Sequence, residues 1–580
     1  EPLGLGEIAM VCETAEGSPI RGEKYLLLPP HTPHLGDHGY PATVQRPDGS
    51  LYTLCYQADR LNESPCILGC GWRLPSDERF DLVKDGVLQV NVVCGDSEPE
   101  RLAKAEFLRV MDAVTGCGTN GVAANKIVLK VDSSLGDGDT YEIKFERFER
   151  FGRSGRLVVS GSNPRSVVFG MMTVLHRLGC RWFWPGADGE YLPAPTKDLS
   201  LPVFSEKSTA AFPYRQLSSH PFKPKAWFFC HNRMNPWTGS DDSRHRVYWG
   251  QTSAWGGHSF GWIWPENVKS RKEYFERFPE QFALWNGKRV MSQHCYTNPD
   301  TIRTFQDWIL RFWPAHPQTE ILNLSAIDTP VHCTCPECEK KDSSTLFFDF
   351  VNTITEPARK AFPQKRYSTI AYSFYLKPPK TKLAPDTMMS YCMYNRCYCH
   401  GFADETCPLN PRAAEGMRGW REALGHAPEI YGYHFDVWGG PLAYSAPFAP
   451  VLQDEARRAR DAGVRFWFTE YNGPLERMNV MRFEAYAFAR LAWDPDLDFA
   501  ALRRDWCRRV YGPAAKPMEA YLAAMENAWA DCGQHVGGYN NAPSRFVDKF
   551  VTDDLIKAVD AQFAEAERAL AASPDPRAAR

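Results

Sequence analysis

The sequence predicts an α/β protein built around a (β/α)8 TIM-like barrel, with a small α/β domain before the barrel and a helical C-terminal unit after it. Three observations support this fold class. Short apolar runs alternate with helical or looped connections over residues 211–473, which is the pattern of a barrel of parallel strands. Strands also alternate with helices over residues 86–186, and the chain beyond residue 473 has a helical pattern rich in Ala and Arg.

The length and the changes of pattern indicate four segments. A chain of 580 residues is too long for one hydrophobic core. Short alternating runs separated by Pro and Gly predict a small β-rich unit over residues 1–85, and this unit suggests no chemistry. The α/β domain is expected at 86–205, the catalytic barrel at 206–478 and the helical domain at 479–580.

The expected α/β domain begins with a strand and closes after a helix. Its predicted strands are 88–94, 126–131 and 156–160, and its predicted helices are 99–114 and 164–178. Gly179 is placed to cap the second helix, and Pro185 prevents the helix from continuing.

The barrel is expected to contain eight strands, of which the later ones have the clearer pattern. They are 214–218, 259–264, 281–285, 321–327, 367–374, 388–393, 430–435 and 464–469. Apolar residues at helical spacing over 343–363 predict the crossover helix that a parallel fourth and fifth strand require. Helices are also expected after the barrel, at 481–492 and 502–510.

Net charge and hydropathy argue against a nucleic-acid partner and against a membrane-spanning segment. The 67 basic and 70 acidic residues give a formal net charge of -3, so the chain has no large positive field with which to hold nucleic acid. No run of about 18 or more uncharged apolar residues occurs, so no membrane span is expected. The first residues have no signal-peptide pattern, and an export signal is expected to lie outside this numbering.

Aromatic residues make up 13% of the chain, and many of the 18 Trp lie beside Gly, Pro, Asn or His rather than inside periodic apolar runs. Flat rings stack on the apolar faces of sugars, so this placement favours a sugar-binding cleft. Burial in a core is the competing explanation for any single Trp.

Three acidic residues directly follow predicted barrel strands, namely Asp328, Asp436 and Glu470. The residue just past the C-terminal end of a barrel strand faces the rim where active sites are built. Glycoside hydrolysis needs one acid to protonate the leaving oxygen and a second group to form or stabilise the cationic sugar centre. The three acids therefore predict sugar chemistry.

Two groups of motifs resemble known families. Residues 161–186, from Gly-Ser-Asn-Pro-Arg to Leu-Gly-Cys-Arg-Trp-Phe-Trp-Pro-Gly, resemble the N-terminal domain of family 67 α-glucuronidases and several other glycosidases. The barrel resembles the catalytic domain typified by glycoside hydrolase family 163, and two further segments resemble the helical region that follows that domain. The motifs that carry this second resemblance are Leu-Ser-Ala-Ile-Asp at 324–328, Cys333, Cys335, Cys338, Cys397, Cys-Pro-Leu-Asn at 407–410, Phe-Thr-Glu at 468–470, Leu-Ala-Trp-Asp-Pro-Asp at 491–496 and Tyr-Gly-Pro-Ala at 511–514.

The family 163 resemblance implies an endo-β-N-acetylglucosaminidase that acts on complex N-glycans. It implies a retaining acid/base mechanism, in which the acetamide of the substrate can be the nucleophile. The expected partner is a glycan or glycoprotein, no cofactor is expected, and the expected location is secreted, periplasmic or cell-surface in a bacterium. The chain departs from the family pattern at Thr329-Pro330, where such domains usually have a glycine pair, and this puts the substrate in question.

Each acid has a proposed role and a structural alternative. Glu470 is the expected general acid/base, and Asp328 is the expected second carboxylate, which would orient and polarise the acetamide. Asp436 is expected either to bind sugar hydroxyls or to act as the second carboxylate in place of Asp328. The alternatives are that Asp328 caps the turn before Pro330 and that Glu470 binds an arginine.

Polar and aromatic residues near the predicted strand ends are candidates for substrate binding, although a lone His or Arg is more often structural. The candidates are His258, Asn232, Arg233, Asn235, Tyr372, Asn395, Arg396, His434, Trp438 and Tyr471. An alternative glycosidase for a uronic or sulfated glycan would aim Arg215, Arg233 and Arg396 at the anion. A non-catalytic glycan-binding protein and a metal-dependent hydrolase are the remaining alternatives.

Three closely spaced cysteines could bind a metal, form a disulfide or remain reduced thiols. Cys333, Cys335 and Cys338 offer three thiolates, and His332 or a remote cysteine could complete a structural zinc site. Only one such cluster is evident, so a disulfide or reduced thiols are favoured over a metal.

A disulfide between Cys397 and Cys407 is predicted, because the two flank a short loop. It would stabilise the protein by about 2–3 kcal/mol through loop-closure entropy.

Overall fold

The chain forms two compact units, residues 1–80 with 202–204 and residues 81–201 with 205–580. The computed structural model describes residues 8–13, 19–28, 39–45, 51–57, 66–72, 79–118, 125–147, 155–217, 225–235, 254–255, 257–402, 404–436, 447–470, 481–537 and 547–573.

The described part of the first unit consists of β-strands. The antiparallel hairpin contains β1 (Ile8–Glu13) and β2 (Pro19–Leu28), and the antiparallel sheet contains β3 (Gly39–Gln45), β4 (Leu51–Gln57) and β5 (Cys66–Trp72). These strands agree with the β-rich character expected from the alternating runs.

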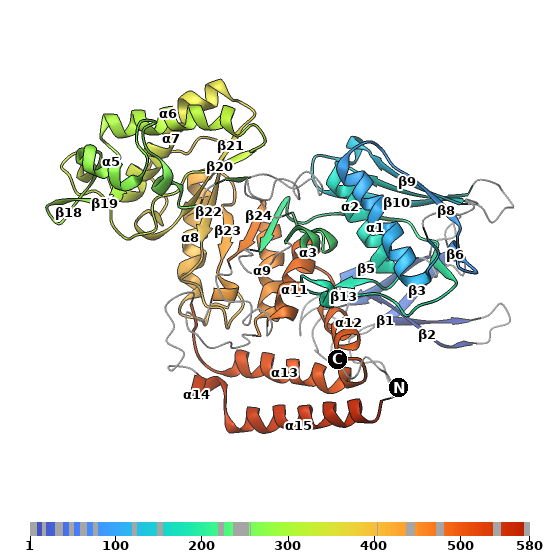
Figure 1. Cartoon of the computed structure of the whole chain (residues 1–580). Coiled ribbons are helices and arrows are strands. Elements are labelled where there is room, and N and C mark those ends of the chain that lie inside the picture. The colour runs from blue at the N-terminus through green and yellow to red at the C-terminus, as the bar shows by residue number, and fades with distance from the viewer. Residues whose placement is uncertain are drawn as a thin grey trace. The chain divides into compact units, whose positions relative to one another are not determined.

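The second unit begins with a five-stranded mixed sheet in the order β15-β10-β11-β9-β8. Its strands are β8 (Val90–Val93), β9 (Asn125–Val131), β10 (Thr140–Arg147), β11 (Gly155–Gly161) and β15 (Glu206–Thr209), and its helices are α1 (Glu98–Thr115) and α2 (Pro164–Arg177). The predicted strands and helices are confirmed, while β10 and β15 were not expected. The two helices pack against each other (Figure 1).

Sequence-local capping explains where these helices begin and end. Ser97 and Glu100 form a reciprocal capping box at the start of α1, and the side chain of Asn163 accepts from the Ser166 N–H at the start of α2. Gly179, with φ 97°, adopts the left-handed conformation just after α2, as its position predicts.

A seven-stranded parallel sheet follows, in the order β16-β24-β23-β22-β21-β20-β17. Its strands are β16 (Tyr214–Leu217), β17 (Ala254–Trp255), β20 (Ile321–Asn323), β21 (Arg366–Ala371), β22 (Thr387–Cys392), β23 (Glu429–Gly432) and β24 (Phe466–Thr469). The fold is therefore α/β with a parallel, barrel-like sheet, and the described strands do not make up the eight of a complete (β/α)8 barrel.

Two expected barrel strands are wrong. Residues 259–264 contain a 3-10 turn, η4 (Ser259–Trp262), and residues 281–285 contain β18 (Phe282–Trp285), which pairs antiparallel with β19 (Lys288–His294) outside the parallel sheet. For 281–285 the reason lies in Asn286-Gly287, whose φ values of 50° and 75° form the tight turn of a hairpin.

Helices connect most of the parallel strands and bury apolar residues against them. They are α6 (Pro299–Ala315), α7 (Ser343–Ala361), α8 (Asn410–Leu424) and α9 (Ala449–Ala462). The predicted crossover helix is confirmed as α7, which follows β20, precedes β21 and buries Phe347, Phe350 and Ile354. Full burial of such side chains contributes about 1.5–3 kcal/mol each.

The chain ends in helices, as expected. They are α11 (Arg482–Trp493), α12 (Phe499–Tyr511), α13 (Ala515–Asp531), α14 (Val547–Phe550) and α15 (Asp553–Ala571). Figure 1 shows α13 and α15 lying side by side, and the two helices are in contact. Among the described helices, none has the length and apolar character needed to cross a membrane.

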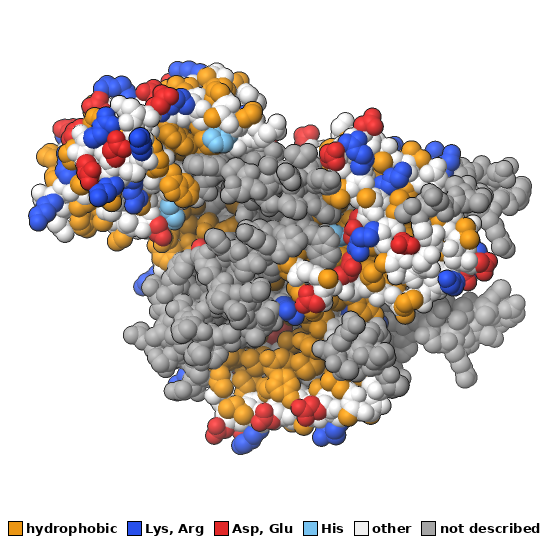
Figure 2. Space-filling model, viewed as in Figure 1, with side chains coloured by type: hydrophobic (Ala, Val, Ile, Leu, Met, Phe, Trp, Pro, Cys, Tyr) orange, Lys and Arg blue, Asp and Glu red, His pale blue; other side chains and the backbone are white. Residues whose placement is uncertain are grey.

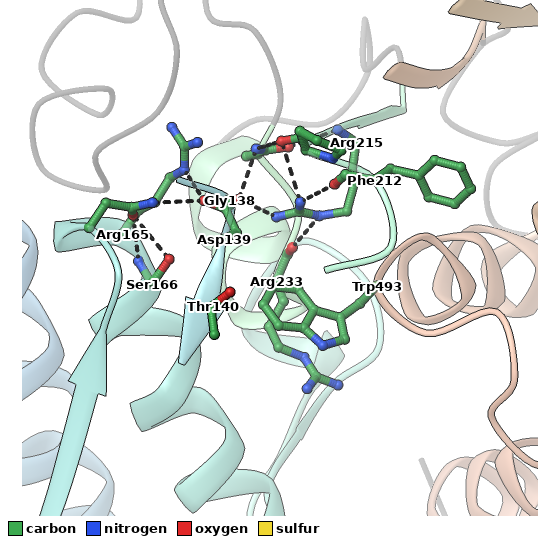
Figure 3. A network of polar contacts seen from close by, with 12 residues as sticks. Gly138, Asp139, Thr140, Arg165, Ser166, Phe212, Arg215, Arg233 and Trp493 are labelled. Carbon is green, nitrogen blue, oxygen red and sulfur yellow. Dashed lines mark hydrogen bonds and ion pairs between the residues drawn. The ribbon is translucent and has the colours of Figure 1, made fainter. Parts of the chain in front are cut away.

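A buried polar network joins the mixed sheet to the parallel sheet within the second unit (Figure 3). The carboxylate of Asp139, just before β10, accepts from Arg165 Nε at 2.8 Å and from Arg215 Nη2 of β16 at 2.8 Å. It also accepts from the side-chain amides of Asn163 at 3.1 Å and Asn235 at 3.0 Å. Four donors therefore satisfy one carboxylate that is fully removed from solvent.

The surface over α5 (Arg271–Arg277) and the β18–β19 hairpin carries intermingled acidic and basic side chains (Figure 2). This mixture agrees with the small formal net charge of the chain.

Candidate functional site

Five side chains follow the carboxyl ends of five adjacent parallel strands, four of them within two residues and Asp328 after five. They are Asp328 after β20, Tyr372 after β21, Tyr394 after β22, Tyr433 after β23 and Glu470 after β24. We call these five residues the rim site. Consecutive strands of a parallel sheet present these ends at one edge, and this is the edge at which α/β proteins build active sites.

Asp328 has two polar neighbours within the rim. His258 Nε2 lies 3.9 Å from Asp328 Oδ1, and His258 Nδ1 lies 2.6 Å from the Ala326 carbonyl oxygen. Because a carbonyl can only accept, Nδ1 carries a proton and Nε2 faces the carboxylate. The side chain of Asp328 is 62% exposed, so it is open to a ligand.

Tyr372 is the second neighbour of Asp328. Burial raises the pKa of the Tyr372 hydroxyl, and the negative charge of Asp328 raises that pKa further. Tyr372 therefore stays protonated at neutral pH and can donate to the carboxylate. The next residue, Ser373, has φ 52°, a strained conformation of the kind found at functional sites.

The charges of both carboxylates of the rim site reach Cys392, the last residue of β22. Burial raises the pKa of the Cys392 thiol, and the charges of Glu470 and Asp328 both raise it further. Two carboxylates that follow β20 and β24 thus act electrostatically on one buried thiol. The Glu470 N–H donates to the Gly432 carbonyl at 2.8 Å, which fixes its position beside β23.

Gly432 allows β23 and β24 to approach at this point. A Cβ atom at residue 432 would lie 2.9 Å from the His434 ring and 3.2 Å from the Phe468 carbonyl oxygen. A side chain would force these groups apart, so glycine is required where Tyr433 and Glu470 lie.

Aromatic rings form a continuous wall along the rim. Ring centroids are 5.8 Å apart for His258 and Tyr372, 5.5 Å apart for Tyr372 and Tyr394, and 6.1 Å apart for Tyr394 and Tyr433. His258, Tyr372 and Tyr394 are partly exposed and offer apolar faces and hydroxyl groups, a combination suited to sugars, whereas Tyr433 is buried in the core. The sequence analysis identified Tyr372 but missed Tyr394 and Tyr433, although their positions two residues and one residue after the strands β22 and β23 were an available signal.

Four other predicted residues follow β22, β23 or β24 in the sequence. Asn395 is exposed beside Tyr394. Asp436 ends the 3-10 turn η8 (His434–Asp436) after β23, and its side chain is outside the described part of the structure. Trp438 and Tyr471 lie outside the described residues, so their proposed roles stay predictions.

Two predicted binding residues are instead placed in a buried ion-pair network beneath the rim. The Arg396 guanidinium is fully buried and pairs with Glu455 of α9, and His434 Nε2 lies 3.2 Å from the same carboxylate. Trp467 Nε1 also donates to Glu455, at 2.7 Å. Burial and the positive charge of Arg396 hold the pKa of His434 well below its usual range, so that imidazole is neutral.

The structure places Asn232, Arg233 and Asn235 away from the rim site. The amide of Asn232 donates to the Trp182 carbonyl, and Arg233 Nη1 donates to the Tyr141 hydroxyl at 3.0 Å. All three side chains are buried where the mixed sheet meets the parallel sheet, and Asn235 belongs to the network of Asp139. These contacts hold the three side chains inside the protein.

The three arginines considered as ligands of an anionic sugar make contacts inside the protein instead. Arg215 is fully buried against Asp139, Arg396 is fully buried against Glu455, and the guanidinium of Arg233 lies 5.0 Å from the centroid of the Trp493 ring. None of them reaches the rim site.

The predicted disulfide between Cys397 and Cys407 is wrong. Both are free thiols, and among the described cysteines none is bonded to another. Two groups of side chains have the composition of a metal site instead. They are Cys295, Cys333, Cys335 and Cys338, and a second group formed by Cys397, His400, Cys407 and His535.

Comparison with protein families gives one match. Residues 184–523 match the model of a family described as a domain of unknown function, DUF4838. No curated protein matches the sequence.

Several solved structures resemble the fold. An exo-β-N-acetylglucosaminidase of family GH20 from Vibrio harveyi, in complex with N-acetylglucosamine, has a TM-score of 0.42 and 12% identity over 78% of this chain and 82% of its own. A family 89 glycoside hydrolase from Clostridium perfringens has a TM-score of 0.46 and 10% identity over 81% and 60%. The structure of CpGH84D has a TM-score of 0.42 and 10% identity over 87% and 84%. Likenesses at this level carry no argument about activity.

Proposed function

Since the chain belongs to the DUF4838 family, whose description states no activity, we propose from the rim site itself that the protein is a glycoside hydrolase acting on glycans that contain N-acetylglucosamine. The observation that carries this proposal is the pairing of Asp328 and Glu470. Both follow strands of one parallel sheet, and the charges of both raise the pKa of the Cys392 thiol at the end of β22.

Glu470 is the proposed general acid/base. Its backbone is held by Gly432, next to the buried strand β24, and a carboxylate in this position can protonate the leaving oxygen. The same carboxylate then removes a proton from the attacking water, since the acid of the first step becomes the base of the second.

Asp328 is the proposed second carboxylate. His258 and Tyr372 flank it, and the Tyr372 hydroxyl can donate to it, which supports its orientation from the protein side. In a substrate with an acetamide at C2, a carboxylate so placed accepts from the amide N–H and directs the carbonyl oxygen at the anomeric carbon. The partly exposed rings of His258, Tyr372 and Tyr394 supply a surface on which pyranose rings stack.

The proposed substrate is a complex N-glycan, cleaved internally as in family 163 enzymes. This finer assignment rests on the resemblance of the motifs at 324–328 and 468–470. Export to the periplasm or cell surface rests on the same resemblance. The free described thiols would be unusual in an exported protein unless another ligand holds them.

The test is glycan release from a glycoprotein that bears complex N-glycans, followed by mass spectrometry. The wild type is compared with Glu470→Gln and with Glu422→Gln, a matched change at an exposed position of α8. Release of glycans ending in one N-acetylglucosamine by the wild type and Glu422→Gln, but not by Glu470→Gln, is expected. Equal release by all three would refute the role of Glu470, and binding without release by the wild type would favour a non-catalytic glycan-binding protein.

A further inference from the structure

Four cysteines from two separate segments meet beside the loop that carries Asp328. Cys295 follows the β18–β19 hairpin, and Cys333, Cys335 and Cys338 lie in the segment after Asp328. All four are buried, and their sulfur atoms lie within 4.8 Å of one another. The sequence analysis expected a fourth ligand from His332 or a remote cysteine, and the structure supplies Cys295.

The spacing of these sulfur atoms matches a metal site rather than a disulfide. Cys295 Sγ lies 3.7 Å from Cys338 Sγ and 3.8 Å from Cys335 Sγ. Four sulfur atoms about 2.3 Å from a central zinc ion, arranged as a tetrahedron, lie about 3.8 Å apart. A disulfide would bring two sulfur atoms to about 2.05 Å, far closer than these distances.

We propose that Cys295, Cys333, Cys335 and Cys338 bind one structural Zn²⁺ and that Cys397, His400, Cys407 and His535 bind a second. The first site has four thiolates, so all positions of a tetrahedral ion are filled by the protein, and none is open for substrate or water. Neither site depends on the reaction proposed above.

Hydrogen-bond donors around the first site suit a group of thiolates. The Leu284 N–H donates to Cys333 Sγ at 3.2 Å, and Thr297 Oγ1 lies 3.2 Å from Cys338 Sγ. A zinc ion with four thiolates has a net charge of about -2, and a buried anion of this kind requires such donors. These two contacts provide them from the hairpin side.

Separate contacts support the second proposed zinc site. Cys397 Sγ lies 3.2 Å from His400 Nδ1, and Cys407 Sγ lies 3.4 Å from His535 Nδ1. In a tetrahedral zinc site, sulfur and nitrogen ligands lie about 3.6 Å apart, close to both distances. His535 follows α13, so the site would join the C-terminal helices to the loop after β22.

The two ions would fix two loops of the rim. The segment from Asp328 to Cys338 contains little regular structure, and its Thr334 N–H bonds to the Leu284 carbonyl at 2.8 Å. The loop that starts at Cys397 follows Tyr394 by three residues. Loops that lack secondary structure need such cross-links to hold a site with little movement.

The test is the metal content of the full-length protein, purified with reduced thiols and in the presence of zinc. Two zinc ions per chain are expected by elemental analysis and native mass spectrometry. Cys335→Ser should lose one ion and Cys407→Ser the other, while Cys117→Ser, a matched change at a half-buried cysteine outside both groups, should keep two.

X-ray absorption at the zinc edge of the wild type tests the ligands without any variant. The two sites together predict six sulfur and two nitrogen ligands, a ratio of 3:1, whereas the first site alone predicts sulfur only. One zinc ion lost only in Cys335→Ser would refute the second site and keep the first. A wild type that binds no zinc, or disulfides among these cysteines in the purified protein, would overturn the proposal.

Discussion

Replacing Asp139 by Asn would test the buried network that joins the mixed sheet to the parallel sheet (Figure 3). In the wild type, Oδ1 accepts from Asn163 and Arg165, and Oδ2 accepts from Arg215 and Asn235. The amide introduced by Asp139→Asn would keep one oxygen and would turn an NH2 group toward two donors. The charge that balances the buried guanidinium of Arg215 would also be lost.

The expected loss of stability follows from the pKa of Asp139. Burial alone would raise that pKa, but the charges of Arg165 and Arg215 outweigh it and hold the pKa at about 2, below its ordinary value of 3.8. A shift of this size corresponds to about 2 kcal/mol. Leaving a buried cation unpaired costs about 3–5 kcal/mol, so Asp139→Asn should lower the free energy of unfolding by about 2–4 kcal/mol.

The pH dependence of the stability that Asp139 contributes follows from the direction of its pKa shift. Because the folded-state pKa is lowered, the stabilisation is present above the ordinary pKa of 3.8 and is lost as the pH falls toward about 2. The gap in stability between the wild type and the variant should therefore be full at about pH 6 and should shrink below about pH 4.

Urea unfolding followed by tryptophan fluorescence measures the effect, since the Trp493 ring lies 5.1 Å from the guanidinium of Arg215. Asp137→Asn is the matched control, because Asp137 is exposed two residues away. A control that loses as much stability as Asp139→Asn, or a loss below about 1 kcal/mol for Asp139→Asn at about pH 6, would refute the reasoning.

Two further predictions concern the rim site and a buried acid. Asp328→Asn should lower glycan turnover by about 10²–10³-fold without changing the unfolding midpoint, because the side chain is exposed; retained turnover at an unchanged midpoint would remove Asp328 from the mechanism. Burial raises the pKa of Glu484 in α11 to about 8, so its contribution to stability is present below the ordinary pKa of 4.5 and is lost as the pH rises through about 8. Glu484→Gln should therefore be more stable than the wild type at about pH 9, by up to about 5 kcal/mol, and equal to it near pH 4.5; equal stability at both pH values would contradict the assignment.

The parallel strands that carry the rim site were predictable because their apolar runs end abruptly in polar residues. The run before Asp328 and the run before Glu470 both correspond to strands of the sheet. The strand β17 was missed because two residues provide no periodic pattern. The error at 281–285 arose because the Asn286-Gly287 turn was overlooked, although this dipeptide favours a hairpin.

The site was only partly predictable because burial and partners come from distant segments. Arg396 and His434 have the residue types of a binding site, but Glu455 of α9 holds both in the interior. Asn235 and Arg215 are likewise fixed by Asp139, far away in the chain. Cys295 could not be assigned to the cluster of Cys333, because nothing in the sequence between them fixes their distance in space.

The central claim is that Glu470 protonates the leaving group. The most direct test compares the activity of Glu470→Gln on substrates with different leaving groups. The variant is assayed on a glycoprotein and on an aryl N-acetylglucosaminide whose phenol leaves without protonation. We expect a loss of about 10²–10⁴-fold on the glycoprotein and a much smaller loss on the aryl substrate. Equal losses on both substrates, or no loss on the glycoprotein, would contradict the account.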